Sequence, residues 1–245
     1  GQKENKIDIS KLMNEQKIVL INLSKGKIGE ENSSFFGSMF LTKIKQAGME
    51  RAHIPEKDRK DFYIYVDEFQ NVVTQTFENI LSEARKYGLN LTMAHQYVGQ
   101  IQPKIYQSIL GNVGSIISFR VGGEDATRLK PEFDPLFGVK DMINLAVGEF
   151  YIKMTIDGES YDPFSAETLR VLPPTHRSYR QEILDASRRK FSIRKEDAQR
   201  LIEEEEATII RSAEEKAAIE GKKKDTKEEK TEDTKQAKTE AEPMI

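Results

Sequence analysis

The chain has 245 residues and a mass of 28.1 kDa, which gives room for one ordinary α/β domain or for a small domain with a tail. It has no cysteine and only three histidines, none at metal-ligand spacing, which excludes disulfides, thiol catalysis and thiolate or histidine-based zinc sites. The formal net charge is −3, and residues 203–245 carry 14 acidic and nine basic side chains, so the body is near neutral and any affinity for nucleic acid must come from local patches.

The first half of the chain alternates apolar runs with helical patterns. A continuous apolar run at 17–23 predicts a strand buried on both faces. A helix is expected next, ending near Glu50. Its possible N-caps are Asn32, Ser33 and Ser34, and one apolar stripe along it consists of Phe36, Phe40, Ile44 and Ala47. A second strand follows at 62–66, then a helix at 77–87 that Gly88 ends, and a third strand at 89–94.

The second half continues this alternation. Two short helical pieces, at 98–101 and 105–110, precede a fourth strand at 115–121, and a helical turn is expected at 124–129. Alternation with period 2 predicts a strand at 149–156, and Asp157-Gly158 is typical of a tight hairpin. The order of strands and helices predicts an α/β fold in which helices cover a parallel sheet.

The C-terminal region is expected to lie outside this sheet. Charged helical patterns at 178–190 and 195–219 predict a helical arm over 173–220, in which Glu203–Glu206 is most simply a solvated helix face and otherwise a docking surface for a basic partner. Residues 221–245 contain too few apolar side chains to offset the entropy of ordering, so we predict a disordered charged tail.

Polar residues stand at the C-terminal ends of the predicted strands, where open parallel sheets bind their ligands. These residues are Ser24-Lys25, Asp67-Glu68, His95-Gln96 and Arg120. Four apolar residues followed by Asp67-Glu68 fit a nucleotide-hydrolysis motif, in which Asp67 holds the Mg²⁺ shell and Glu68 orients the attacking water. The alternative is that a buried strand simply ends in acids that begin the next helix.

Three further residues each have a functional and a structural interpretation. The side-chain amide of Gln96 could sense a γ-phosphate, a role for which His95 could compete, or it could be an ordinary loop residue. Arg85 could be a catalytic arginine, or a cation favoured by the dipole in the last turn of a helix. Arg120 could be an arginine finger presented to a neighbouring subunit, or form an edge salt bridge with Glu124 or Asp125.

The phosphate-binding loop of such an enzyme is absent from the sequence. A Walker A loop needs Gly-x4-Gly-Lys-Ser/Thr, whereas the two Gly-Lys pairs here, Gly26-Lys27 and Gly221-Lys222, lack both the upstream glycine and the hydroxyl residue. Because the chain also begins without methionine, we expect it to be the C-terminal portion of a longer protein, cut after its P-loop.

Several segments in fixed order resemble a known family. After Asp67-Glu68 come residues 80–89 (ILSEARKYGL), 94–97 (AHQY), 110–115 (LGNVGS) and 119–122 (FRVG). This order resembles the C-terminal half of the ATPase domain in TraD/TraG/VirD4-like coupling proteins of conjugation and type IV secretion, within the HerA–FtsK translocase superfamily. The resemblance covers about residues 17–172.

The resemblance implies a RecA-like P-loop NTPase fold, a homo-hexameric ring, ATP with Mg²⁺ in the intact parent, and transport of DNA or a DNA–protein complex through a pore. By motif, Asp67 would be the Walker B acid near Mg²⁺, Glu68 the catalytic glutamate and Gln96 the sensor. Arg85 and Arg120 would be alternative trans-acting fingers. Residues 1–172 would form the partial ATPase domain, and secretion-channel or relaxosome proteins would be partners.

Two other functions stay open from the residues. The chain could be a non-catalytic interaction or oligomerisation module derived from this fold, or an unrelated doubly wound domain whose acids bind a metal or a small phosphorylated ligand. The resemblance also leaves open a HerA- or VirB4-like ATPase outside conjugation. No apolar run approaches the ~20 residues of a membrane span, and no secretory leader opens the chain. We therefore expect a cytoplasmic protein, or one held at the cytoplasmic face of the membrane by upstream segments. Without the first strand and the P-loop helix, an open apolar surface predicts weak solubility or self-association.

Overall fold

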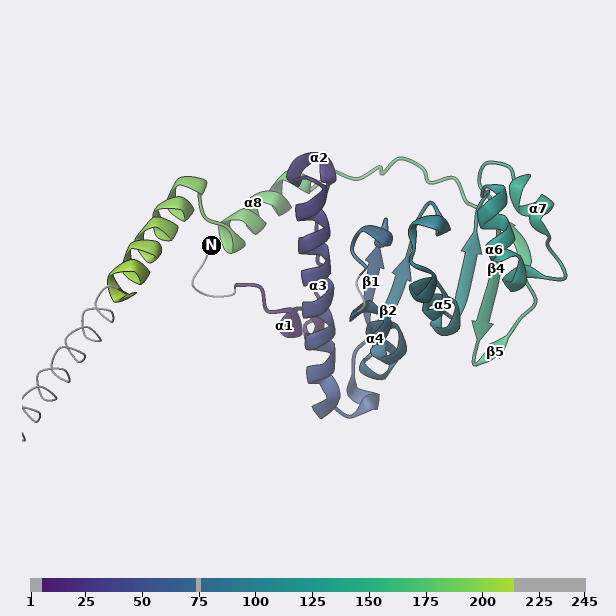
Figure 1. The fold of residues 1–245 in the computed structure, drawn as a ribbon, viewed down its shortest axis with the longest axis horizontal. Coiled ribbons are helices and arrows are strands. Elements are labelled where there is room, and N and C mark those ends of the chain that lie inside the picture. The colour runs from purple at the N-terminus through teal and green to yellow at the C-terminus, as the bar shows by residue number, and fades with distance from the viewer. Residues whose placement is uncertain (1–5, 74–75, 214–245) are drawn as a thin grey trace, which may run out of the picture. The chain divides into compact units, whose positions relative to one another are not determined.

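The computed structural model of the protein describes residues 6–73 and 76–213 (Figure 1). It divides into two compact units, Asp8–Pro174 and a second unit of Gly1–Ile7 with Thr175–Ile245. The first unit contains helices and a parallel strand pair, so the predicted α/β class is confirmed. The predicted disordered tail at 221–245 lies outside the described residues.

A long helix, α3 (Glu30–Glu50), dominates the start of the first unit, after the short helices α1 (Ile9–Asn14) and α2 (Lys25–Ile28). The helix is confirmed and its expected cap is wrong, while its expected stripe is right only in part: Ala47 is buried and Ile44 packs against the core, whereas Phe36 is exposed. Gly29, with φ at 83°, is the N-cap, and Ser33 instead donates its hydroxyl to the Leu23 carbonyl at 2.6 Å. The buried face also contains small residues that the apolar stripe did not include, and its members are Ser33, Gly37, Leu41, Ala47 and Gly48.

The predicted strand at 17–23 is not formed. Ile18 and Leu20 are 90% and 82% exposed, and the segment has no strand pairing. Among the described residues, β1 (Phe62–Val66) pairs with β2 (Leu89–Met93) alone, so its other edge offers unpaired backbone groups. An apolar run becomes a strand only where a neighbouring strand accepts its hydrogen bonds, and here that pairing is absent.

The unit from β1 to β2 follows the sequence prediction closely. β1 and β2 are parallel, with Phe62 opposite Leu89 and Val66 opposite Met93. The connection is α4 (Thr76–Glu83) and a 3₁₀ turn, η4 (Ala84–Tyr87), and Gly88 ends it in the left-handed conformation at φ 67°. The glycine fits because it has no Cβ to clash at positive φ.

The main core joins α3, α4 and one face of the parallel pair, as Figure 1 shows for the ribbons. Leu41, Ile64, Phe77 and Ile80 are among its buried members. Only one face of β1 contributes, because Tyr63 and Tyr65 point away and are 60% and 75% exposed.

Two glycines allow α3 to approach its neighbours closely. A Cβ on Gly37 would lie 2.2 Å from Val72 Cγ1, and one on Gly48 would lie 2.6 Å from Leu89 Cδ1. Real Cβ atoms do not approach so closely, so a side chain at Gly37 would push against the stiff Val72, whereas one at Gly48 would displace the flexible end of Leu89.

The remaining strands form a second sheet in the same unit. After η5 (Val98–Gln100) and α5 (Pro103–Asn112), β3 (Ser115–Ser118) pairs with β4 (Glu149–Ile156), which also pairs with β6 (Phe164–Glu167) and the two-residue β5 (Glu159–Ser160). All these pairings are antiparallel, so the expectation that the strand at 115–121 joins the parallel sheet is wrong: its backbone groups pair with β4. The predicted hairpin is confirmed, with Asp157 and Gly158 at φ 53° and 85° between β4 and β5.

Helices α6 (Gly123–Phe133) and α7 (Val139–Ile143) pack together beside this second sheet, and 3₁₀ turns complete the first unit at η1 (Arg51–His53), η2 (Glu56–Asp58) and η3 (Phe69–Asn71). The second unit contains α8 (Arg180–Phe191) and a further helix over 195–213, which agrees with the charged helical patterns. No helix in the described part of the chain is long and apolar enough to cross a membrane.

Candidate functional site

The acid pair lies at the C-terminal end of β1, as predicted. Asp67 directly follows the strand and is exposed, and its Oδ1 accepts a hydrogen bond from the Glu68 backbone N–H at 3.0 Å. Glu68 adopts a left-handed backbone conformation with φ at 49°. This conformation costs a non-glycine residue about 1–2 kcal/mol, and such strain is concentrated at functional sites.

Two amides hold the Glu68 carboxylate. Gln96 Nε2, in the loop after β2, donates to Glu68 Oε1, and Gln70 Nε2, in η3, donates to Oε2 at 2.6 Å. Both oxygens are therefore oriented by donors from separate elements. The structure brings Gln96 to Glu68 as the strand ends suggested, because β1 and β2 are parallel and adjacent.

Gln70 is a residue that sequence reasoning missed. Its Oε1 is buried and has no hydrogen-bond partner among the described residues, although its Nε2 is committed to Glu68. A buried carbonyl oxygen without a partner costs about 1–3 kcal/mol. In the sequence, the only sign that Gln70 belongs to the site is its position two residues after Glu68. Any residue near the start of a helix could occupy that position.

A basic side chain reaches the same edge from the segment before α3. Lys25 Nζ donates to Asn71 Oδ1 at 2.9 Å and pairs with Glu30 Oε1 at 2.6 Å, and Asn71 Nδ2 donates to the Glu68 carbonyl at 3.1 Å. The ion pair lowers the pKa of Glu30 through the hydrogen bond and charge of Lys25. Lys25 is thus tied to the turn that carries the acid pair.

A cavity of about 590 Å³ opens beside these residues. Its apolar lining comes mainly from α3, β1 and the segment 21–23. The polar residues that also line it include Ser24, Lys25, Asp67, Glu68 and Asn71. A concave apolar site with a few convergent polar groups is the usual form of a ligand site.

His95 is the predicted competitor of Gln96, and it faces a different neighbour. Its ring meets Phe69 edge-on, with ring centroids 5.2 Å apart. Although the residue as a whole is exposed, this contact removes water from part of the ring and lowers the pKa of His95, against smaller opposing effects of the Tyr97 backbone and of the Asp125 and Glu68 carboxylates. The amide that reaches Glu68 is therefore that of Gln96.

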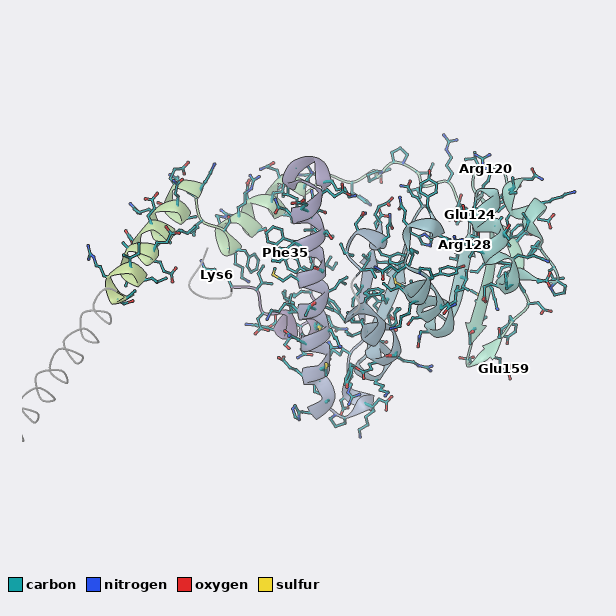
Figure 2. The ribbon with its side chains drawn as sticks, viewed as in Figure 1. Lys6, Phe35, Arg120, Glu124, Arg128 and Glu159 are labelled. Atoms are coloured by element: carbon teal, nitrogen blue, oxygen red, sulfur yellow. The ribbon has the colours of Figure 1, made fainter. Side chains whose placement is uncertain are left out.

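The region of Arg120 is linked to the loop after β2. The buried Asp125, near the start of α6, accepts a hydrogen bond from the Val98 N–H through Oδ2 at 3.3 Å. Arg120 itself is exposed and has no carboxylate partner among the described residues, since Glu124 pairs with Arg128 at 2.8 Å (Figure 2). The edge salt bridge that was the alternative for Arg120 is not formed.

Arg85 lies away from the acids within one chain. It is exposed in η4, which precedes β2, whereas Asp67 and Glu68 follow β1. Because the two strands are parallel, a strand length of roughly 13 Å separates the two ends. The structure therefore does not bring Arg85 to Glu68 in the same chain.

Asp67 suits the Mg²⁺ role that the resemblance implies. Mg²⁺ sites commonly use one or two carboxylates together with water and phosphate oxygens. Asp67 is exposed and only its Oδ1 is engaged, by a backbone N–H, whereas both Glu68 oxygens already accept from amides. No group of three or more ligating side chains occurs within residues 6–73 and 76–213, so a metal here would depend on Asp67, water and phosphate.

Comparison with known proteins gives one family match and several similar structures. Residues 61–130 match the family described as the TraM recognition site of TraD and TraG. No curated protein matches the sequence. The bacterial conjugative coupling protein TrwB, in an unbound form, is 12% identical with a TM-score of 0.45, over 56% of this chain and 37% of that one. The genome packaging NTPase B204 of Sulfolobus turreted icosahedral virus 2, in complex with AMPPCP, is 16% identical with a TM-score of 0.46, over 67% of this chain and 73% of that one.

The family match spans β1, α4, β2, α5, β3 and most of α6, the stretch that carries Asp67, Glu68, Gln96 and Arg120. The chain covers little more than a third of the TrwB length. The predicted resemblance to TraD/TraG-like proteins is thereby confirmed, and residues 61–130 are the part of the chain that carries it.

Proposed function

We propose that this chain carries the metal-binding acid and the catalytic glutamate of an ATP-driven transport ATPase of the conjugation type. The observation that supports this most directly is the Glu68 carboxylate, fixed at the end of β1 by the amides of Gln70 and Gln96. A carboxylate oriented in this way can position a water molecule for attack on a phosphorus atom and accept a proton from that water.

The residues around the acid pair have separate tasks in this proposal. Asp67 would hold Mg²⁺ through its exposed carboxylate, and the bound Mg²⁺ would neutralise charge on the phosphates. Gln96 would couple the loop after β2 to the state of Glu68. Because these 245 residues contain no Gly-x4-Gly-Lys-Ser/Thr loop, the cradle for the phosphates would come from other polypeptide.

Ring assembly and DNA transport belong to the same proposal. Arg85 and Arg120 are both exposed, and Arg120 has no carboxylate partner in the described part of the chain. An arginine that is far from the acids of its own chain can act on the site of a neighbouring subunit. We propose a homo-hexamer that moves DNA, or a DNA–protein complex, with either arginine as the finger.

ATP hydrolysis by the complete reading frame that encodes this chain tests the proposal. Glu68→Gln removes the base but keeps the shape, so we expect kcat to fall by about a hundredfold or more while ATP binding is retained. DNA should stimulate the wild type. Glu56→Gln, in η2 at the other end of β1, is the matched control and should hydrolyse ATP normally. Unchanged turnover in Glu68→Gln would refute the catalytic assignment.

A second function is supported by the family description alone. Residues 61–130 match a segment described as a TraM recognition site, so we propose that this stretch also recognises a TraM-like relaxosome protein. This agrees with the interaction-module alternative and does not need hydrolysis. Binding of a TraM-like protein by both the wild type and Glu68→Gln would support it, and loss of binding in Glu68→Gln alone would tie recognition to catalysis.

A further inference from the structure

A compact basic cluster lies in the second unit, outside the candidate ATPase site. Five of the eight residues from 188 to 195 are basic, and no acidic residue interrupts them: Arg188, Arg189, Lys190, Arg194 and Lys195. We call these five residues the basic cluster. They span the end of α8, the three-residue break at 192–194, and the first residue of the helix over 195–213.

The charges of the basic cluster are available to a partner. All five residues are exposed, and none forms an ion pair with a carboxylate in the described residues. The acids of α8 are engaged elsewhere, since Glu182 pairs with Arg177 and Asp185 accepts from Gln181 at 3.0 Å. Lys190 lies over the ring of Phe191, 5.2 Å from its centroid.

Helix energetics explain only part of the cluster. Cations in the last turn of α8 are favoured by the helix dipole, which accounts for Arg188, Arg189 and Lys190. Arg194 and Lys195 stand at the start of the next helix, where the dipole disfavours positive charge. Their presence therefore points to a role other than helix stability.

We propose that the basic cluster binds the phosphate backbone of nucleic acid. Three of its five cations are arginines, whose planar guanidinium groups bind phosphate oxygens bidentately. Short runs rich in lysine and arginine are typical of phosphate-binding patches. An anionic membrane is the other polyanion to consider, but the segment from 188 to 195 offers only Phe191 and Ile193 as apolar side chains, too few for an interfacial helix.

The acidic residues that follow do not cancel this charge. The run Glu203–Glu206 begins eight residues after Lys195, about 12 Å along a helix, which exceeds the Debye length of roughly 8 Å at physiological salt. Nearer to the cluster, Glu196 is exposed and directly follows Lys195, so it offsets one of the five positive charges, whereas Asp197 pairs with Arg200 at 3.3 Å. The acidic run would instead confine a polyanion to the basic cluster.

Fluorescence anisotropy of the full 245-residue chain with a labelled DNA duplex of mixed sequence tests the proposal without ATP. The test variant is the triple Arg188→Gln, Arg189→Gln and Lys190→Gln. The matched control neutralises three exposed lysines of the first unit, Lys43→Gln, Lys57→Gln and Lys140→Gln, with the same change of net charge. We expect the test variant to lose at least about tenfold in affinity near 0.15 M salt, with a salt slope reduced by about 2–3, and the control to bind like the wild type.

A second variant separates binding from the folding of α8. Arg194→Gln with Lys195→Gln leaves α8 intact and should also weaken DNA binding, by a smaller factor. Equal losses in the test and control triples would overturn the proposal, because binding would then follow net charge alone. Binding to phosphatidylserine vesicles, but not to DNA, would overturn it in favour of a membrane surface. ATP hydrolysis plays no part in the readout, so this proposal and the proposed ATPase function fail independently.

Discussion

Gln70 Nε2 donates a hydrogen bond to Glu68 Oε2 over 2.6 Å, from a side chain whose Oε1 is buried without a partner among the described residues. Gln70 therefore orients the candidate catalytic carboxylate at some expense in stability. Such a combination is typical of a residue retained for function.

Replacing Gln70 should separate stability from activity. In Gln70→Met the lost hydrogen bond, worth about 1 kcal/mol, is offset because the unpartnered oxygen leaves the interior, so the free energy of unfolding should change by less than about 1 kcal/mol. ATP turnover of the complete reading frame should nevertheless fall by roughly tenfold, since Glu68 loses one of its two orienting donors. Urea unfolding and steady-state kinetics measure the two effects. Gln100→Met, in the exposed part of η5, is the control that should change neither.

The close packing of α3 predicts opposite effects for two glycine-to-alanine changes. Gly37→Ala places a methyl group against Val72 and should destabilise the protein by about 1–3 kcal/mol. Gly111→Ala, in α5, meets nothing within 4 Å and should stabilise it by up to about 1 kcal/mol, because alanine is the better helix former. Thermal unfolding of both variants checks the sign. A Gly37→Ala variant as stable as the wild type would show that α3 does not pack as described.

Asp125 should position the loop that carries Gln96. Its carboxylate is buried and accepts from the Val98 N–H, so Asp125→Ala leaves that N–H without its acceptor and should cost about 1–3 kcal/mol. Asp125→Asn keeps a carbonyl oxygen at the same place and should recover most of the loss. Hydrogen exchange at Val98 is the direct measurement: fast exchange in the alanine variant alone is expected, and slow exchange in both variants would contradict the role.

The lowered pKa of His95 should make the free energy of unfolding depend on pH. Because its pKa is lower in the folded protein than in the unfolded chain, the unfolded state takes up a proton first as the pH falls. His95 does not affect the free energy of unfolding at pH values above the ordinary histidine pKa of about 6.5. Below that pH it destabilises the fold progressively, until the pH reaches the lowered pKa of the folded state. His95→Gln should flatten the dependence of Tm on pH between about 7 and 5. An unchanged profile in that variant would assign the effect to other groups.

The exposed apolar segment before α2 predicts self-association. Ile18 and Leu20 are 90% and 82% exposed, and one edge of β1 is unpaired among the described residues, so a second copy can cover both surfaces. Ile18→Asp with Leu20→Asp should leave the melting temperature nearly unchanged and shift the sedimentation profile toward monomer. A wild-type chain that is monomeric at all concentrations would refute this expectation.

The local pattern of the chain was enough to predict several of its separate elements. The strands at 62–66 and 149–156, the left-handed Gly88 and the Asp157-Gly158 hairpin follow from short-range rules, because apolar runs, β-alternation and the tolerance of glycine for positive φ act over a few residues. The acid pair was also found in this way, since it directly follows a strand. Its parallel neighbour β2 then placed Gln96 at the same edge.

Pairing and side-chain contacts were decided only by the tertiary structure. The run at 17–23 is as apolar as a buried strand, yet it remains unpaired, and the strand at 115–118 pairs with β4 rather than with β2. Hydrogen-bond partners of a strand lie far away in the sequence, so composition cannot specify them. For the same reason, the amides on Glu68, the contact of Lys25 with Asn71 and the pairing of Glu124 with Arg128 rather than with Arg120 became apparent only once the elements were packed.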